Sequence, residues 1–295
     1  MVSVAVRCRS CSFYCTIFTF VFVGIGIAPR YLSAQGRLQK MREEVRTAPP
    51  EDSEEEKHRP HNYQEHFHFD GHDDEDHTFS EFLSLTLFYG LISPFWGPPV
   101  LVGDNYDRSA SFRNYPYQHS QRGGIVFDSI ENARPWRARV RSDYADDFSG
   151  LSSLGGQLLL ESASRFGFDT EIQNRRETVG LGDDNLWTGD SNIVFRFAQS
   201  EYLEMRTGIG VNWLSDSVDT EFGVNFTYGG DLFLRDPWIV SAELDLGRLG
   251  HSQLIHVRST IGVQFHRMEV FTGFDHYAIG DVEHNGLVSG IRFWW

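Results

Sequence analysis

Cysteine is nearly absent from this chain of 295 residues and is confined to its beginning. The three cysteines are Cys8, Cys11 and Cys15, and they lie within a segment that we expect to be removed. The mature chain would then have no cysteine at all. Both a disulfide framework and a zinc site with thiolate ligands are therefore excluded.

Lysine is scarcer still, because Lys40 and Lys57 are the only two and both precede residue 134. Cations in the rest of the chain are arginines. The formal net charge is −15, and it becomes −18 if residues 1–34, which carry three arginines and no acidic residue, are removed. So acidic a chain has little electrostatic reason to bind nucleic acid, and we expect no nucleic-acid partner.

The first 34 residues have the features of a secretory signal peptide. Arg7 and Arg9 precede an apolar run over residues 12–28, and small residues follow before Gln35. Signal peptides have a basic start and a short apolar centre, followed by small residues at the cleavage site. This pattern predicts cleavage after Ala34. The alternative is an uncleaved anchor, because about 17 apolar residues is the lower limit for a spanning helix.

Residues 35–78 predict a disordered, acidic and histidine-rich linker. Residues 37–45 could form two helical turns with Leu38, Met41 and Val45 on one side, ended by two prolines. The remainder has too few apolar residues to form a core. Four alternating side chains, His66, His68, Asp70 and His72, could bind a divalent metal ion loosely, although a solvated spacer is the simpler interpretation. We expect no tight metal site and no cofactor.

Residues 79–133 form an aromatic bridge segment between the linker and the strands. A short helix is predicted to begin at Ser80 and to end at Gly90 or Pro94, with two further strands as the alternative. About a dozen residues are too few to cross a bilayer as a helix, so an interfacial position or packing against a barrel end is expected. The rest should be loop, apart from a brief apolar stretch at 125–127.

From residue 134 onward, apolar and polar residues alternate with a period of two, which is typical of β-strands. Strands of about 10 to 13 residues exceed the soluble average of about five or six and match membrane strands. The pattern predicts ten strands, with eight or twelve as alternatives, over 136–144, 156–163, 166–173, 187–197, 203–213, 218–228, 238–246, 255–266, 268–277 and 286–295. We therefore predict an all-β fold: an antiparallel up-and-down transmembrane β-barrel over residues 134–295.

Large aromatic residues on the apolar face gather at strand ends, as membrane interfaces require. The predicted girdle comprises Trp136, Trp187, Trp213, Trp238, Phe265 and Trp295. Connections near 164–165, 199–200, 234–237 and 267 are predicted to be short inner turns. Those at 146–153, 176–186, 215–217, 248–253 and 279–285 are predicted to be longer outer loops.

The polar face would line the interior. Its predicted charge cluster comprises Arg137, Arg139, Arg141, Glu161, Asp169, Glu171, Arg196, Glu204, Arg206, Glu221, Glu243, Arg258 and Arg292. A ten-stranded barrel has little spare room, so these groups should interlock and exclude a wide pore. A narrow, slightly cation-favouring channel is the alternative.

The alternating strands and the final residues GIRFWW resemble small outer-membrane β-barrel proteins of diderm bacteria. The resemblance covers about residues 134–295, is architectural, and matches no characterised subfamily. It implies outer-membrane lipid as surroundings, recognition of the C-terminal strand by the barrel-assembly machinery, and an N-terminal linker on the periplasmic side. The implied role is a structural or surface-binding barrel, or a porin-like narrow channel.

Two other function classes remain open from the sequence. A soluble secreted β-sandwich binding module also has one apolar and one polar face on each strand. A hydrolase at the barrel mouth would need histidines, carboxylates or serines near the outer rim. The candidates there are Asp183, Asp184, His251, Ser252, Asp275, His276, Asp281, Glu283 and His284. They form no recognisable enzyme motif, so we expect that the protein is not an enzyme and assign no catalytic residue.

Overall fold

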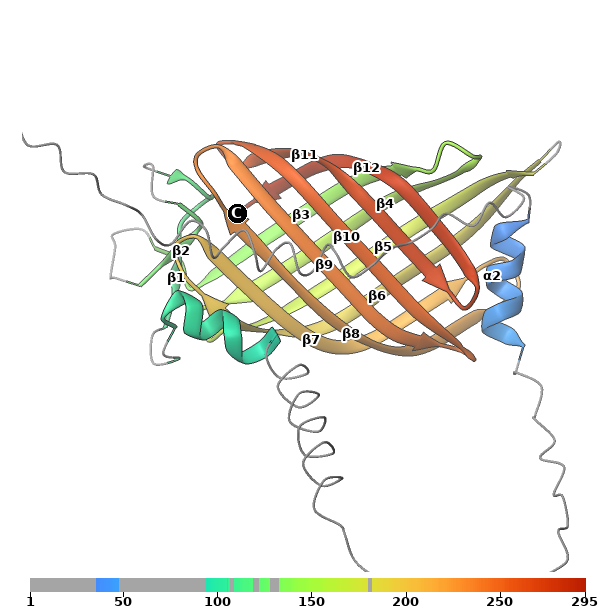
Figure 1. Ribbon diagram of the computed structural model, residues 1–295, viewed down its shortest axis with the longest axis horizontal. Helices are drawn as coiled ribbons and strands as arrows, with labels where there is room; N and C mark the ends of the chain where they lie inside the picture. The colour runs from blue at the N-terminus through green and yellow to red at the C-terminus, as the bar shows by residue number, and fades with distance from the viewer. Residues whose placement is uncertain are drawn as a thin grey trace, which may run out of the picture. The chain divides into compact units, whose positions relative to one another are not determined.

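The computed structural model describes residues 36–47, 94–104, 106, 109–118, 122–127, 133–179 and 182–295. A closed antiparallel barrel dominates it, in which β3 to β12 pair in chain order and β12 pairs with β3 (Figure 1). The strands are β3 (Trp136–Asp146), β4 (Leu151–Ser162), β5 (Phe166–Val179), β6 (Gly182–Gln199), β7 (Leu203–Ser215), β8 (Thr220–Phe233), β9 (Trp238–Leu249), β10 (Ser252–Phe265), β11 (Met268–Ile279) and β12 (Val282–Trp294). The predicted fold class and the count of ten strands are confirmed.

Burial in the barrel is inverted relative to a soluble protein. Side chains that point outward are apolar and exposed, with Ile209 at 71% and Val224 at 68% of their full accessible surface. Those that point inward are polar or charged and buried, as Arg206 and Asn225 are at 4% each. Alternate residues of a strand point to opposite faces, so one period-two pattern produces both surfaces. The soluble sandwich is wrong, because there is a single closed sheet with a charged interior.

The barrel has two rims, which we name by what lies there. The terminal rim holds the start of β3, the end of β12 and the connections 163–165, 200–202, 234–237 and 266–267. The helix rim holds the connections 147–150, 216–219, 250–251 and 280–281, together with the ends of β5 and β6 at Val179 and Gly182.

The prediction of longer outer loops is wrong, because connections at both rims are two to four residues long. β5 and β6 extend further than expected, and their outward-facing residues there are polar. Arg176 and Asp183, for example, form an exposed ion pair across the two strands. Polar residues on the outer face resemble loop residues in sequence, although the backbone pairing continues.

Helix α2 (Arg37–Arg46) closes the helix rim. Leu38, Met41 and Val45 lie on one side of it at helical spacing and are fully buried. They pack on apolar residues at the strand ends, namely Leu151, Leu186, Leu214, Leu249, Leu254, Tyr277, Ile279 and Val282. The helical turns considered for residues 37–45 are therefore present, and the barrel covers their apolar stripe.

Polar contacts hold both ends of α2 in place on the helix rim. The carboxylate of Glu177 accepts hydrogen bonds from the free backbone N–H groups of Arg37 at 3.1 Å and Leu38 at 3.0 Å, which places a negative charge at the helix N-terminus. At the other end, Arg42 and Arg46 bind the carboxylate of Asp216 at 2.8 and 3.1 Å. Although burial opposes ionisation, hydrogen bonds from Arg46 and from backbone N–H groups hold the pKa of Asp216 well below its ordinary value.

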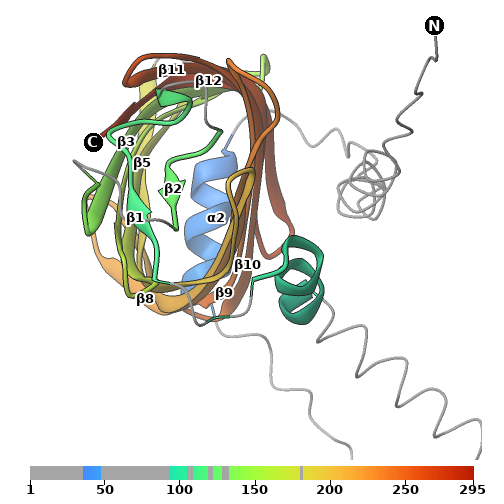
Figure 2. The same ribbon diagram turned by 90° about the vertical axis from the view of Figure 1, so that its left-hand side faces the viewer.

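The terminal rim is closed by residues 109–118 and 122–127. Strand β1 (Ser111–Phe112) pairs with β2 (Ile125–Val126), and the two lie within the barrel outline in the end-on view (Figure 2). Phe112 is fully buried, with its ring 4.8 Å from the guanidinium carbon of Arg137 and 4.9 Å from that of Arg196. The segment expected to be an irregular lead-in is thus a plug.

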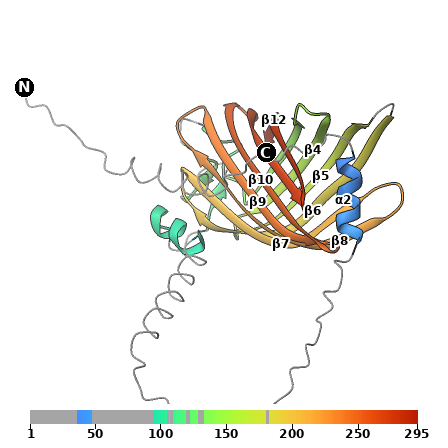
Figure 3. The same cartoon turned by 45° about the vertical axis from the view of Figure 1, so that its right-hand side comes forward.

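Residues 94–102 form a helix on the outer wall of the barrel, which we call the external helix (Figure 2, Figure 3). The ring of Phe95 packs on those of Phe197, Phe226 and Tyr228. The helix predicted from Ser80 lies outside the described residues, and the described helix begins at Pro94 and runs through Pro98 and Pro99, where none was predicted. Pro98 has no N–H for the carbonyl of Pro94, and the Tyr228 hydroxyl donates to that carbonyl instead, at 2.7 Å. Within the described ranges, no helix is both long and apolar enough to cross a membrane.

We predict that Asp216→Asn loosens α2. Loss of one carboxylate shared by two arginines should speed trypsin cleavage after Lys40 about fivefold, corresponding to about 1 kcal/mol. Because the folded pKa of Asp216 is depressed, this contribution is present above the ordinary aspartate pKa and is lost only as the pH falls through the depressed value. Asp236→Asn, in an exposed turn of the terminal rim, is the control. Equal cleavage rates for the two variants would show that Asp216 does not hold α2 in place.

Candidate functional site

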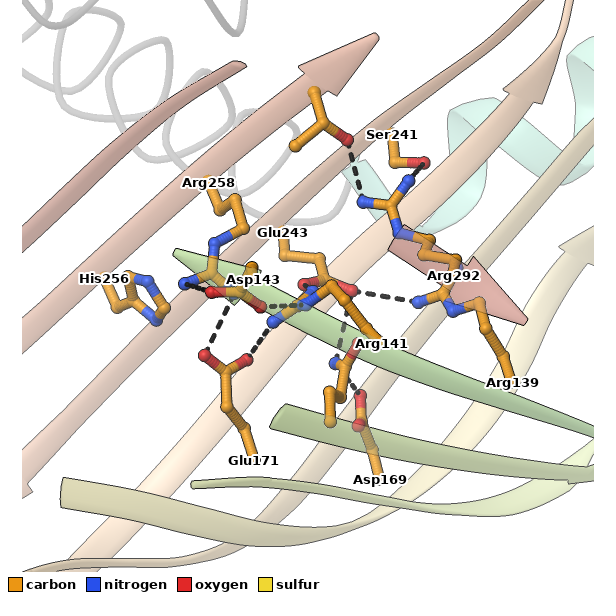
Figure 4. Close-up of polar contacts among 12 residues, drawn as sticks. Arg139, Arg141, Asp143, Asp169, Glu171, Ser241, Glu243, His256, Arg258 and Arg292 are labelled. Carbon is orange, nitrogen blue, oxygen red and sulfur yellow. Dashed lines mark hydrogen bonds and ion pairs between the residues drawn. The ribbon is translucent and has the colours of Figure 1, made fainter. Parts of the chain in front are cut away.

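The interior of the barrel is the candidate site, because it gathers most of the buried charge. Its buried polar and charged side chains come from every strand of the barrel. Figure 4 shows part of this set, with Arg141, Glu171 and Glu243 pointing toward one another. Twelve of the thirteen residues predicted for the charge cluster are buried there. The exception is Glu221, whose carboxylate is 31% exposed at the helix rim and 3.9 Å from Arg46.

Near the terminal rim, the network begins at Arg137. Its guanidinium binds both Glu161, on the neighbouring strand β4, and Glu204, on β7 farther around the barrel. Arg196 donates to the second oxygen of Glu161 at 3.0 Å. Two acids and two cations therefore form a closed group beneath Phe112. Trp294 covers it as well, with its ring 5.2 Å from the guanidinium carbon of Arg137.

Glu243 is the centre of the network (Figure 4). It accepts hydrogen bonds from Arg139 at 3.1 Å, Arg206 at 2.7 Å and Arg141 at 2.6 Å. Arg139 and Arg206 also share Asp231, at 2.9 and 2.8 Å. Four strands are thus joined across the axis through two carboxylates. Charge-assisted, forked contacts of this kind are what guanidinium groups make best.

Toward the helix rim the chain of ion pairs continues. Arg141 also binds Asp143 and Glu171, and Glu171 binds Arg258 at 2.9 Å. Asp275 accepts from Arg258 at 2.7 Å and lies 2.9 Å from a ring nitrogen of His256. These pairs extend the network along the axis.

A separate pair lies near β12. Arg292 donates to Glu269 at 2.6 Å and to the hydroxyl of Thr260 at 2.8 Å, and it lies over the ring of Phe271 at 4.2 Å. Gly262 faces the Glu269 carboxylate directly, where any side chain would collide with it. The glycine therefore makes room for the ion pair.

Beyond the ion pairs, a small hollow of about 20 Å³ lies near the helix rim. Carboxylates of Glu171, Asp190 and Asp245 line it, with His256 and Tyr277. Its volume is enough for about one water molecule. In the described part of the chain, no group of three or more histidines, cysteines and carboxylates is arranged to hold a metal ion.

Several interior residues escaped the sequence analysis. Asp231 and Arg175 belong to the parts of β8 and β5 that extend beyond the predicted strands. His256 lies within the predicted strand 255–266 but is not in the predicted charge cluster. The signal for Asp231 was present, because the alternation resumes after Gly229 and Gly230 and brings residues 231 and 233 to the inner face. Arg175 lies over the Tyr277 ring at 3.6 Å and within 3.0 Å of a ring nitrogen of His284.

The girdle residues all lie on the outer face, in two groups. Trp136, Trp238, Phe265 and Trp295 are 42–56% exposed at the terminal rim. Trp187 and Trp213 lie near the helix rim, where Trp213 pairs with Gly189 across β6 and β7. The predicted signal peptide and the loose metal candidates His66, His68, Asp70 and His72 fall outside the described residues.

Several of the hydrolase candidates at the helix rim are engaged in other contacts. Asp184 binds Arg42, and the hydroxyl of Ser252 donates to the backbone oxygen of Glu44. A ring nitrogen of His276 pairs with Asn285. No hydrogen bond links a serine hydroxyl to a histidine ring among residues 133–179 and 182–295, so an activated serine is not assembled there.

We predict that Glu243→Gln is strongly destabilising. Neutralising this carboxylate leaves three buried guanidinium groups without their shared anion, at a cost of about 3–5 kcal/mol. Guanidinium chloride unfolding of the detergent-folded protein measures the effect.

Glu283→Gln is the matched control. It makes the same change of side chain on the outer face of β12, where Glu283 is only half-buried. If both variants unfolded at the same denaturant concentration, the proposal that Glu243 is central to the stability of the interior would be wrong.

No known protein family matches this chain, and no curated protein matches it. Among solved structures, it is similar to the outer membrane protein Ail of Yersinia pestis in a phospholipid bilayer nanodisc, with 12% identity and a TM-score of 0.31 over 54% of this chain and 99% of that one. It is also similar to the beta domain of the Bordetella autotransporter BrkA, with 11% identity and a TM-score of 0.28 over 54% of this chain and 97% of that one. At such scores the likeness carries no argument about function, and the barrel fold rests on the closed strand order of the chain itself.

Proposed function

We propose that this protein is an outer-membrane β-barrel with a closed, charge-filled interior, which acts as a structural or surface-binding barrel and does not conduct. The observation that carries the proposal is the interior network, in which Glu243 and its neighbours join opposite strands across the axis. Both mouths are also covered, by α2 and by the β1–β2 plug. We infer a non-catalytic role, which the contacts of Ser252 with Glu44 and of His276 with Asn285 support.

The membrane part of the proposal is supported by the outer surface. Apolar side chains such as Ile193, Ile209 and Val224 are more than 60% exposed around the barrel wall. Soluble monomers rarely expose large contiguous apolar patches, because the contact with water is costly. Aromatic residues lie toward both rims, as they do at the two interfaces of a bilayer. Lipid is therefore the solvent that suits this surface.

The closing strand supports assembly as a barrel of a diderm outer membrane. The N–H of Trp295 donates to the carbonyl of Ala138 at 2.9 Å, and the N–H of Ala138 donates back at 3.0 Å. The final residue therefore helps to complete the circle of strands. We propose that the barrel-assembly machinery recognises this terminal strand before closure.

Conductance in planar lipid bilayers tests the closed interior. We expect no stable ohmic current from the full mature chain under conditions in which a general porin conducts. A reproducible ohmic current would favour the narrow-channel alternative, because ions would have to pass the network.

Membrane depth is tested by two substitutions on one face of β10. Ile261 is at mid-strand, whereas Gln253 is exposed on the same face near the helix rim. In lipid, Ile261→Arg should cost about 2–4 kcal/mol and Gln253→Arg about 0–1 kcal/mol, measured by reversible unfolding from lipid vesicles. Equal and small costs would argue for a water-exposed barrel.

A further inference from the structure

The small hollow near the helix rim is lined by two carboxylates that no arginine neutralises. Asp190 and Asp245 reach it from β6 and β9. Asp190 accepts a hydrogen bond from the side chain of Asn192 at 2.7 Å, and Asp245 lies 3.3 Å from a ring nitrogen of His256. Among the described residues, neither carboxylate pairs with a guanidinium group. This part of the interior therefore differs from the surroundings of Glu243, where three arginines share one carboxylate.

The other charged groups at the hollow do not neutralise these two. Glu171 is also negative, and it already binds Arg141 and Arg258. Arg175 lines the hollow, but its guanidinium lies over the Tyr277 ring at 3.6 Å and within 3.0 Å of a ring nitrogen of His284. In the described ranges it pairs with no carboxylate. The negative charge of the hollow therefore remains uncompensated.

Amide side chains bring further oxygen atoms to the hollow. Asn212, Asn225 and Gln173 line it, and each is at most 4% exposed. The side-chain oxygen of each is buried and accepts no hydrogen bond. Buried polar atoms in folded proteins nearly always have a partner. These oxygens therefore need a partner that the described side chains do not supply.

The nitrogen atoms fix the orientation of the two asparagine amides. Asn212 Nδ2 donates to the backbone carbonyl of Val224 at 3.1 Å, and a carbonyl can only accept. Asn192 Nδ2 donates to the Asp190 carboxylate, so Asn192 Oδ1 is the acceptor for Asn225 Nδ2 at 3.1 Å. A flip of either lining amide would set oxygen against oxygen. The atoms left without a partner are therefore oxygens.

Glycines on the neighbouring strands make room for these amides. Gly223 on β8 is the cross-strand partner of Asn212, and Gly247 on β9 is that of Asn225. A Cβ atom at Gly223 would lie 2.5 Å from Asn212 Oδ1, and one at Gly247 would lie 3.2 Å from Asn225 Oδ1. Each amide thus occupies space that a side chain on the next strand would fill.

One water molecule would not satisfy this set of atoms. The hollow of about 20 Å³ has room for about one. A water could accept from Arg175 Nη2, which has no hydrogen-bond partner, and could donate to two oxygens. The remaining oxygens would stay unpaired, and the negative charge would stay uncompensated. A cation contacts several oxygens at once and supplies positive charge, and carboxylate and amide oxygens are the ligands that hard cations prefer.

We propose that this hollow is a calcium site, in which Asp190 and Asp245 supply the charge and Asn212, Asn225 and Gln173 supply neutral oxygens. The two carboxylates balance the two charges of the ion. Magnesium suits the hollow less well, because it keeps several of its waters and a space of about 20 Å³ does not hold them.

The site differs from a cluster of three or more histidines, cysteines and carboxylates, of which the described part of the chain holds none. Only two of its ligands are carboxylates, and the others are neutral amides. Because the ligands come from five consecutive strands, β5 to β9, no local spacing in the sequence indicates them. The folded barrel alone forms the site, so the inference goes beyond the proposed function and does not depend on the lipid around the barrel.

Calcium binding by the full mature chain, folded in detergent and stripped of metal with EGTA, tests the proposal. Isothermal titration with calcium chloride should show one ion per chain, and calcium should raise the denaturant midpoint of unfolding. Magnesium chloride should bind at least about tenfold more weakly. Absence of binding at about 1 mM calcium, the weak end of protein calcium sites, would overturn the proposal.

Substitutions locate the ion. Asp190→Asn and Asp245→Asn should each weaken calcium binding at least about tenfold, because each removes a charged ligand. Asp281→Asn makes the same change in an exposed turn of the helix rim and should leave the affinity unchanged. Equal affinities of Asp190→Asn and Asp281→Asn would place the ion on surface acids and overturn the site. Because Asp190 has no arginine partner among the described residues, neutralising it should leave the barrel folded.

A further variant tests the neutral ligands. Asn212→Leu keeps both carboxylates but removes one unpaired oxygen, and it should also weaken calcium binding at least about tenfold. The calcium-dependent rise in the denaturant midpoint should shrink with it. Unchanged calcium affinity of Asn212→Leu would show that the ion does not contact the amide oxygens, and the site as proposed would be wrong.

Discussion

Everything in this structure depends on the need to neutralise charge inside a barrel too narrow to hold bulk water. Ten strands enclose a space that side chains nearly fill. A guanidinium there is not surrounded by water, so most of the buried arginines contact carboxylates, and the central carboxylates each contact several donors. Glu243 and Asp231 meet this requirement by each serving at least two arginines from different strands. Arginine suits this role better than lysine, because its planar group donates in several fixed directions, and the barrel contains no lysine.

The strand array could be predicted from sequence because one local rule produces it. Alternation determines which residues of β10 face inward, and this holds whatever the partner strands are. The strand ends could not be predicted in the same way. Polar residues such as Arg176 and Asp183 on the outer face resemble a loop, and only the backbone pairing of β5 with β6 shows that the strands continue.

The partners of the interior charges were beyond sequence as well, because they depend on how strands meet across the axis. Arg137 could be assigned to the interior from its period alone. That it binds Glu204, 67 residues away, follows only from the closed barrel. The contacts of α2 could not be predicted either, although the spacing of Leu38, Met41 and Val45 indicated its apolar stripe. Nothing local indicated that Glu177 would bind its first N–H groups or that strand ends would cover that stripe.

The long separation between paired charges also bears on how the barrel can form. Arg139 reaches Glu243 over 104 residues, so neither group has this partner while the chain is a set of adjacent hairpins. A half-built barrel would hold unpaired guanidinium groups in its concave face, which must remain hydrated. The interior can lose its water only when the last strand joins the first. Folding should therefore be highly cooperative at closure, with a late and slow step characteristic of chains dominated by distant contacts.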